Sequence, residues 1–407
     1  MAKTDFITGL DIGSNTIKIL TAKKSPDLVD IEILFQGEEP SLGIRKGVVI
    51  DPIKVSETIQ SLVKNAKTET GQDIDSVYVN INGSHIFSTS SHGAIAISRA
   101  DQKVSEEDIE RVLQAAQTFS LPANKEILDV FPREFIVDGE KGIKEVLGIE
   151  GVRLEAEVLV LAGFSPYKKN LVQAVLGSGL KISDIIISPL ASSFAVLSQK
   201  QKELGVALLD IGAGTSSLAV FEEGDLIHLA IFPIGSSNIT NDIAIGLKTD
   251  IDVAERIKIE YGSCFPGKEK KEKIETKDEE SLVFSQKMLC KIIEARVSEI
   301  FEETQKELKK ISKQELLPTG LVLTGAGAKL PKIIDLAKKE LKLPCRLGKP
   351  SGFVGLEKEM AFSVACGLVL KGLEVKETEH WQGNGYLLRI IKKLGNRIKK
   401  AFSILIP

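Results

Sequence analysis

Two stretches about 200 residues apart decide the fold: GLDIGSNT at residues 9–16 and LLDIGAGT at residues 208–215. Each ends an apolar segment with Asp-Ile-Gly, closes on a threonine and is followed by a second apolar segment. A strand that ends in Asp-Ile-Gly places a carboxylate at its carboxyl end, and the glycine lets the following backbone turn tightly. The repeat therefore predicts a duplicated α/β architecture with two similar three-stranded openings.

Turns of this type suit a polyphosphate, because their backbone N–H groups point outward toward an anion. Two copies on opposing sheets predict a nucleotide held from both sides. Asp11 and Asp210 would hold Mg²⁺ through water, and Lys18 would neutralise phosphate charge. One such turn is weak evidence because glycine turns are common, whereas the matched pair favours a binding site. The candidate nucleotide-binding residues in the two turns are Asp11, Gly13, Ser14, Asn15, Lys18, Asp210, Gly212, Ala213, Gly214 and Thr215.

A third glycine turn, TGAGAK at residues 324–329, follows an apolar strand and precedes a helix expected to start at Pro331. Its small residues would admit a flat adenine ring close to the backbone. The candidate residues in this turn are Gly325, Ala326, Gly327 and Lys329. Glu255 and Lys258 share one face of a predicted helix and could reach the ribose or the adenine, although a surface ion pair is an equally good interpretation.

Period-2 and period-3.6 patterns place the remaining elements. The expected strands are 6–12, 16–22, 29–35, 77–81, 94–98, 127–137, 154–161, 182–187, 218–221, 226–232 and 320–323. The expected helices are 51–67, one capped by Ser105 with Asp108 three residues on, one started by Ser165-Pro166, and 190–204, 285–311, 331–342 and 357–372. Residues 267–281 are highly charged, with both signs mixed, and are expected to form a solvated loop or a frayed helix end.

The bulk composition is that of an ordinary globular protein of two or three domains, with 407 residues, 43% of them hydrophobic, and a formal net charge of -3. This charge gives no overall reason to bind nucleic acid. The four cysteines are widely spaced, without a metal-binding pattern, and are expected to be reduced. The N-terminus lacks the order of a secretory signal and no apolar run reaches the length of a membrane span, so a cytoplasmic location is expected.

The C-terminal segment is strongly basic, although the net charge of the whole chain is negative. Residues 374–384 read as a polar tether, and residues 385–407 as an amphipathic helix without any acidic residue. A wholly cationic polar face opposite an apolar stripe is typical of a helix that lies on an anionic membrane, although a helix docked on the protein's own core is an alternative. The candidate membrane-binding residues are Leu387, Ile390, Ile391, Leu394, Ile398, Phe402 and Leu405 on the apolar stripe, and Lys392, Lys393, Lys399 and Lys400 on the basic face.

The three glycine turns, at residues 11–18, 210–215 and 324–329, resemble those of the actin, Hsp70 and sugar-kinase superfamily. The resemblance narrows to the bacterial cell-division family FtsA at GIRKGVVID, residues 43–51, and at PIGSSNITNDIAIGLKT, residues 233–249. Residues 84–162 lie where that family carries its distinctive inserted subdomain, so the similarity covers nearly the whole chain. The resemblance also adds Gly235 to the candidate nucleotide-binding residues, near the terminal phosphate.

The resemblance implies an actin-like (ribonuclease H-like) fold with ATP and Mg²⁺ between its two halves. It implies polymerisation into filaments, binding of the C-terminal tail of FtsZ, contacts with other division proteins, and a peripheral position on the cytoplasmic face of the membrane at the division site. The domains it implies are a first actin-like subdomain at 1–83 and 163–204, the inserted α+β subdomain at 84–162, a second actin-like subdomain at 205–233 and 313–373, a small subdomain at 234–312, a linker at 374–384 and the membrane helix at 385–407.

Two departures from the family pattern concern catalysis. Ser188 stands before Pro189 where the family commonly has a glutamate, which related bacterial actins use to position the attacking water, so hydrolysis is expected to be slow or absent and no catalytic residue is assigned. Ser236 replaces a frequent glycine. The alternatives are a small-molecule kinase of the same superfamily, for which no catalytic base can be named, and the pilus-assembly relative, which lacks the terminal amphipathic helix. An Hsp70-type chaperone is excluded because too few residues follow the last core helix.

Overall fold

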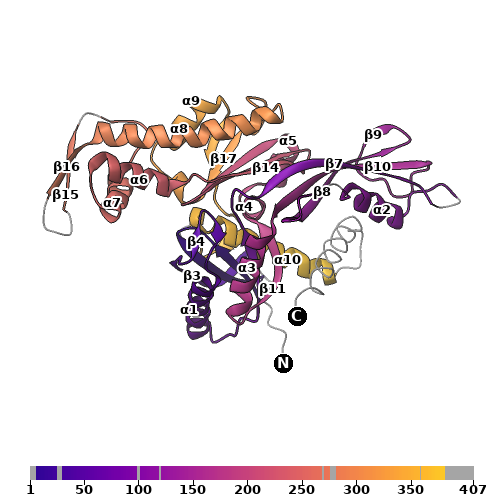
Figure 1. Ribbon diagram of the computed structural model, residues 1–407, viewed down its shortest axis with the longest axis horizontal. Helices are drawn as coiled ribbons and strands as arrows, with labels where there is room; N and C mark the ends of the chain where they lie inside the picture. Colours follow the sequence, from indigo (N-terminus) through magenta and orange to yellow (C-terminus); the bar gives the residue numbers. More distant parts are fainter. Residues whose placement is uncertain are drawn as a thin grey trace. The chain divides into compact units, whose positions relative to one another are not determined.

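The computed structural model describes residues 6–24, 30–98, 101–118, 121–267, 270–275, 281–357 and 359–380, and it contains two compact units. The first unit comprises Met1–Ser84, Tyr167–Gly224 and Ala230–Leu373, and the second comprises His85–Pro166, Asp225–Leu229 and Glu374–Pro407. Each unit has its own sheet structure (Figure 1). All candidate nucleotide-binding residues lie in the first unit, whereas residues 381–407, with the candidate membrane-binding residues, lie outside the described ranges.

The first sheet of the first unit has six strands in the order β11-β6-β1-β2-β3-β19. β1, β2 and β3 form an antiparallel meander, and β6 and β11 extend the sheet in parallel from β1. Asp51 caps the helix α1 by accepting a hydrogen bond from the Lys54 N–H, with Pro52 as its first residue, as the sequence predicts. The elements are β1 (Phe6–Ile12), β2 (Thr16–Lys24), β3 (Ile31–Pro40), α1 (Pro52–Thr70), β6 (Ser76–Ile81), β11 (Lys181–Ile187) and β19 (Phe353–Val354), with the short hairpin β4 (Ile44–Arg45) and β5 (Val48–Val49).

The second sheet repeats this arrangement. Its order is β14-β13-β12-β17-β18, so the series β18-β17-β12-β13-β14 corresponds strand by strand to β11-β6-β1-β2-β3. β12 and β13 are antiparallel, and β17 and β18 extend the sheet in parallel. The predicted duplicated α/β architecture is therefore confirmed. The strands are β12 (Val206–Ile211), β13 (Ser216–Glu222), β14 (Asp225–Phe232), β17 (Leu321–Thr324) and β18 (Cys345–Leu347).

The helical segment expected at 190–204 is two helices, so that prediction was wrong. α4 ends before Leu197, whose backbone is extended at φ −103° and ψ 134°, and Ser198 then starts α5 through a capping box with Gln201. The third glycine turn is a short 3-10 turn, η1, and the following helix begins at Ile333 rather than at Pro331. The helices associated with the first unit are α3 (Ser165–Gly177), α4 (Ser188–Val196), α5 (Gln199–Leu204), α6 (Ser236–Leu247), α7 (Ile251–Tyr261), α8 (Gln286–Lys310), η1 (Ala326–Lys329), α9 (Ile333–Leu341), η2 (Glu359–Phe362) and α10 (Ser363–His380).

The charged segment around residue 275 also differs from expectation. Instead of a solvated loop or a frayed helix end, its described residues form the antiparallel hairpin strands β15 (Lys271–Glu275) and β16 (Ser281–Ser285), which lie beside α6, α7 and α8 (Figure 1). Ile274 and Phe284 are buried, and the ring of Phe284 meets that of Tyr261 edge-on at 5.5 Å. Each strand thus buries one apolar side chain, a weak signal in a segment with so many charges.

The second unit is a four-stranded antiparallel sheet in the order β7-β10-β8-β9 with α2 on it. Asp108 of α2 is fully buried in the predicted capping box, where it accepts hydrogen bonds from Ser105 and Ser98. Burial would raise the pKa of Asp108, but these hydrogen bonds outweigh it and lower the pKa. The periodicity of the sequence did not predict the short strand β9. The elements are β7 (Phe87–Ala96), α2 (Glu106–Ala116), β8 (Lys125–Val137), β9 (Glu140–Ile143) and β10 (Arg153–Phe164).

α10 packs closely against both the first sheet and α4. A Cβ atom at Gly9 of β1 would lie 2.6 Å from the carbonyl oxygen of Ala365, and one at Gly367 would lie 1.6 Å from that of Ala191. These glycines let the backbones approach more closely than any side chain would allow. Within the described ranges, none of the helices combines the length and the apolar composition that crossing a bilayer requires.

Candidate nucleotide-binding site

The two Asp-Ile-Gly segments form the same hairpin turn at the carboxyl ends of β1 and β12. In the first copy the Gly13 N–H donates to the Thr16 carbonyl oxygen at 3.2 Å, and in the second the Gly212 N–H donates to the Thr215 carbonyl oxygen at 2.9 Å. The two turns therefore share the same backbone hydrogen bond at the ends of corresponding strands, so the repeat in the sequence is also a repeat in the structure.

The two turns face each other across a very short distance. A Cβ atom at Gly214 would lie 2.7 Å from Ser14 Oγ and 2.8 Å from Ser14 Cβ. Ser14 Oγ accepts a hydrogen bond from the Gly47 N–H at 2.8 Å, and Asn82 donates its side-chain amide to Thr215 Oγ1 at 3.2 Å. The structure thus brings both turns to one place, and it adds Asn82, which sequence reasoning missed.

Asp11 is buried at the base of the first turn. Asn80 donates to its Oδ1 at 2.9 Å, and the Lys18 ammonium, on the residue opposite in β2, lies 3.7 Å from its Oδ2. Burial raises the pKa of Asp11 above its ordinary value, and the charge of Lys18 and the hydrogen bond from Asn80 oppose that shift. A carboxylate, a lysine and backbone N–H groups therefore lie together, as the sequence predicts.

Asp210 occupies the equivalent place in the second turn. Burial and the nearby charge of Asp11 raise the pKa of Asp210 to about 7, and a hydrogen bond from Ser192 opposes this rise. Two carboxylates close enough to repel each other suit a hard divalent cation, whose charge would relieve the repulsion. The donor set, oxygen atoms only, fits Mg²⁺ held largely through water.

The start of α6 closes over the second turn. The N–H groups of Ser236 and Ser237 donate to the carbonyl oxygens of Gly212 and Ala213, each at 2.9 Å. A Cβ atom at Gly235 would lie 2.4 Å from the Ala213 oxygen, so this position requires a glycine. Gly235, included through the family pattern, therefore sits directly against the second turn.

The third glycine turn meets Asp210 from another side. Gly325 has φ +85°, and a Cβ atom there would lie 2.3 Å from Asp210 Oδ1. A Cβ atom at Gly327 would lie 3.2 Å from the Cβ of Ser236. Ala326 and Lys329 are exposed. All three glycine turns thus converge around the carboxylate of Asp210. The sequence shows the turns as separate motifs and does not show that they meet.

Glu255 and Lys258 pair with each other at 2.6 Å. Lys258 is buried and also donates to Thr240 Oγ1 at 2.9 Å and to the Ser236 carbonyl oxygen at 3.3 Å. Both residues therefore join α7 to the start of α6, beside the second and third turns, rather than forming an isolated surface ion pair.

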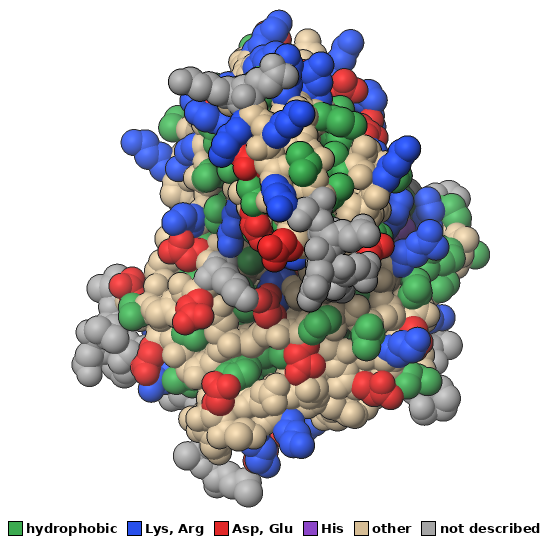
Figure 2. All heavy atoms as spheres, turned by 90° about the vertical axis from the view of Figure 1, so that its left-hand side faces the viewer, with side chains coloured by type: hydrophobic (Ala, Val, Ile, Leu, Met, Phe, Trp, Pro, Cys, Tyr) green, Lys and Arg blue, Asp and Glu red, His purple; other side chains and the backbone are tan. Residues whose placement is uncertain are grey.

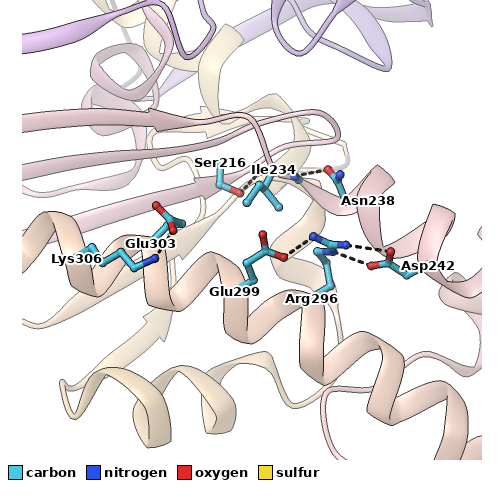
Figure 3. Close-up of polar contacts among 9 residues, drawn as sticks. Ser216, Ile234, Asn238, Asp242, Arg296, Glu299, Glu303 and Lys306 are labelled. Carbon is cyan, nitrogen blue, oxygen red and sulfur yellow. Dashed lines mark hydrogen bonds and ion pairs between the residues drawn. The ribbon is translucent and has the colours of Figure 1, made fainter.

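Separate polar contacts hold the start of α6 and attach the middle of α6 to α8 (Figure 3). Asn238 accepts the Gly235 N–H at 3.0 Å, and one helical turn further on Asp242 binds the guanidinium of Arg296 on α8 at 2.7 and 3.0 Å. Arg296 also pairs with Glu299 on its own helix. This two-point Arg–carboxylate contact fixes α8 relative to the helix that closes the site.

Sequence reasoning missed Asn80 and Ser192, the residues that contact the two aspartates, together with Ser188, which it noted only as a departure from the family pattern. The only local signal for Asn80 is an asparagine at the carboxyl end of an apolar strand, in VYVNING at residues 77–83. Ser188 and Ser192 are one turn apart on α4, and both are buried.

Comparison with known proteins places these features in a family. A family model described as "Cell division protein FtsA" matches residues 207–367, and one described as "SHS2 domain inserted in FTSA" matches residues 83–162. The chain is 37% identical to Cell division protein FtsA of Pseudomonas aeruginosa over 375 residues, covering 90% of this chain and 89% of that protein. It is 37% identical to that of Borreliella burgdorferi over 415 residues, covering 98% and 96%.

Solved structures show the same actin-like fold at lower sequence identity. A chain of the PilM-PilN type IV pilus biogenesis complex has a TM-score of 0.67 and 19% identity, covering 90% of this chain and 98% of that one. MreB5 of Spiroplasma citri, solved bound to ADP, has a TM-score of 0.57 and 12% identity, covering 93% and 99%.

Proposed function

The chain belongs to the FtsA family of cell division proteins, and from that premise we propose that it is an ATP-binding, filament-forming protein that anchors the FtsZ ring to the membrane. The proposal has three parts: a nucleotide site in the first unit, a partner surface on its small subdomain, and a C-terminal membrane anchor. Each rests on different residues and has its own test.

The meeting of the two hairpin turns is the observation that supports the nucleotide site most strongly. Asp11 and Asp210 would hold Mg²⁺ through water, and the ion would neutralise phosphate charge when bound. Lys18 and the N–H groups of the turns would bind phosphate oxygens. The third glycine turn would lie beside the adenine, with Glu255 and Lys258 on the neighbouring helix α7.

Replacing Asp210 by Ala is expected to weaken binding of ATP with Mg²⁺ by at least about tenfold, because one of the two carboxylates facing the ion is lost. Titration calorimetry with and without Mg²⁺ measures this loss. Asp335→Ala, which removes an exposed carboxylate paired with Lys332 on α9, is the matched control and should bind as the wild type does. Equal affinity of the Asp210 variant and the wild type would contradict the site.

For the membrane anchor, the support is the sequence of residues 385–407. Six cations, Arg389, Lys392, Lys393, Arg397, Lys399 and Lys400, lie opposite the apolar stripe, and each contributes about 1 kcal/mol near an anionic leaflet. The apolar stripe adds the burial energy that keeps such a helix at the interface. A peripheral position on the cytoplasmic face of the membrane, at the division site, belongs to the same proposal.

The domain limits given by the sequence also belong to the proposal: 1–83 and 163–204, 84–162, 205–233 with 313–373, 234–312, 374–384 and 385–407. The small subdomain at 234–312 is the proposed binding site for the C-terminal tail of FtsZ. It carries exposed apolar side chains, among them Ile245 and Ile259, which are 76% and 71% exposed. Figure 2 faces this side of the molecule and shows hydrophobic side chains scattered between charged ones.

We expect FtsZ to lose its binding when its C-terminal tail is removed, and the tail peptide alone to bind the chain. Fluorescence anisotropy of the labelled peptide measures the affinity, and a peptide of the same composition in scrambled order is the control. Full-affinity binding by FtsZ without its tail would contradict this part of the proposal.

A further inference from the structure

We infer that Asn80 is a positioning residue of the nucleotide site: it holds the Asp11 carboxylate in place and ties it to the start of α4. The inference rests on the proposed nucleotide site and assigns a task within it to a residue outside the glycine turns. Asn80 is the second-last residue of β6, it is 2% exposed, and its side chain makes three hydrogen bonds.

The orientation of the Asn80 amide is determined by the backbone. The Ile12 N–H donates to Asn80 Oδ1 at 2.6 Å, so the oxygen must face β1 and the amino group must face the other way. That amino group has two hydrogens, and both are used: one on Asp11 Oδ1 and one on Ser188 Oγ, each at 2.9 Å. Ser188 in turn donates to the Ile81 carbonyl oxygen at 3.3 Å. The amide therefore has a single fully bonded orientation, in which it donates to Asp11.

The two oxygens of Asp11 have partners of different kinds. Oδ1 is bound by the neutral Asn80 amide, whereas Oδ2 faces the Lys18 ammonium at the longer distance of 3.7 Å. The Lys18 ammonium also lies 5.9 Å from the centre of the Phe362 ring. A lysine that pairs loosely can turn to a phosphate, and Asn80 would then be the contact that keeps Asp11 oriented.

The second aspartate lies near the same helix. Ser188 and Ser192 lie one turn apart on α4, and both are buried. Ser192 acts on Asp210, whose pKa it lowers against the effect of burial. The start of α4 therefore lies near Asp210 and is joined to Asp11 through Asn80.

The test compares Asn80→Ala with Asn65→Ala, which removes an asparagine of α1 whose amide donates to Glu39 at the surface. ATP affinity is measured by titration calorimetry in Mg²⁺ and in EDTA, and the dissociation constant in EDTA divided by that in Mg²⁺ gives the contribution of the ion. We expect this ratio to fall about tenfold in Asn80→Ala and to stay within about twofold of wild type in Asn65→Ala. Asn80→Leu also removes the amide but keeps the side-chain volume, so it replaces Asn80→Ala in the test if the alanine variant does not fold, and it should lower the ratio to the same extent.

A purely structural role for Asn80 would weaken ATP binding equally in Mg²⁺ and in EDTA, and that result would overturn the inference. An equal loss in Asn80→Ala and Asn65→Ala would also overturn it. Failure of the proposed function looks different, because the wild-type chain would then bind no ATP under either condition.

Discussion

Replacing Gly214 with valine is expected to weaken ATP binding by about 100-fold, which corresponds to about 2.8 kcal/mol. The new side chain would begin 2.7 Å from Ser14 Oγ and 3.3 Å from Lys46 Cα, so the second turn would have to move away from the first. A site formed by two opposed turns loses its geometry when either is displaced, and misplacement of about 1 Å is costly in such sites. Calorimetric titration of ATP in Mg²⁺ provides the measurement.

A double-mutant cycle identifies the steric cause. Ser14→Gly removes both atoms that the new Cβ would approach most closely, so Gly214→Ala should cost much less affinity in the Ser14→Gly background than in the wild type. If the two substitutions were additive, contact between the turns would not be the reason for the loss.

Replacing Ile391 and Phe402 together with glutamine is expected to abolish binding to vesicles that contain anionic lipid. Each fully buried side chain of this size contributes about 1.5–3 kcal/mol, so the loss is at least about 100-fold in affinity. The net charge of the segment does not change, which separates the apolar contribution from the electrostatic one. Co-sedimentation with vesicles measures the bound fraction, and ATP affinity should remain that of the wild type.

The matched control places glutamine at Asn396 and Ser403. At 100° per residue these two positions would lie about 160–180° from the centre of the apolar stripe, on the polar side of the helix. The control should bind vesicles as the wild type does. Equal co-sedimentation of the two double variants would contradict a membrane-bound apolar stripe.

Local signals predicted most of the fold. The repeated Asp-Ile-Gly segments predicted the duplicated sheets, because adjacent residues in the sequence determine a strand and the tight glycine turn that follows it. The caps at Asp51 and Ser105 were equally local, and the structure has both. The capping box at Ser198 is just as local, yet the apolar pattern through Leu204 hid it, and one helix was expected where there are two.

The rest of the site depends on contacts between distant residues. Asn80 meets Asp11 from 69 positions away and Ser188 from 108, and no periodicity links those positions. The close approach of Gly325 to Asp210 is of the same kind. Asp210 lies on β12, and Gly325 directly follows the neighbouring strand β17, more than a hundred residues further along the chain. A single sequence shows which residues can do the chemistry, whereas the sheet order decides which of them meet.

The packing of α10 has a mechanical consequence. The glycines of β1 and α10 let this helix lie directly on the strand that carries Asp11, where a Cβ at Gly372 would come within 2.5 Å of Ile7 and a Cβ at Gly9 within 2.6 Å of the Ala365 oxygen. A helix seated this closely cannot slide along the strand without moving it. A displacement of residues 363–373 would therefore be passed directly to the strand that holds Asp11.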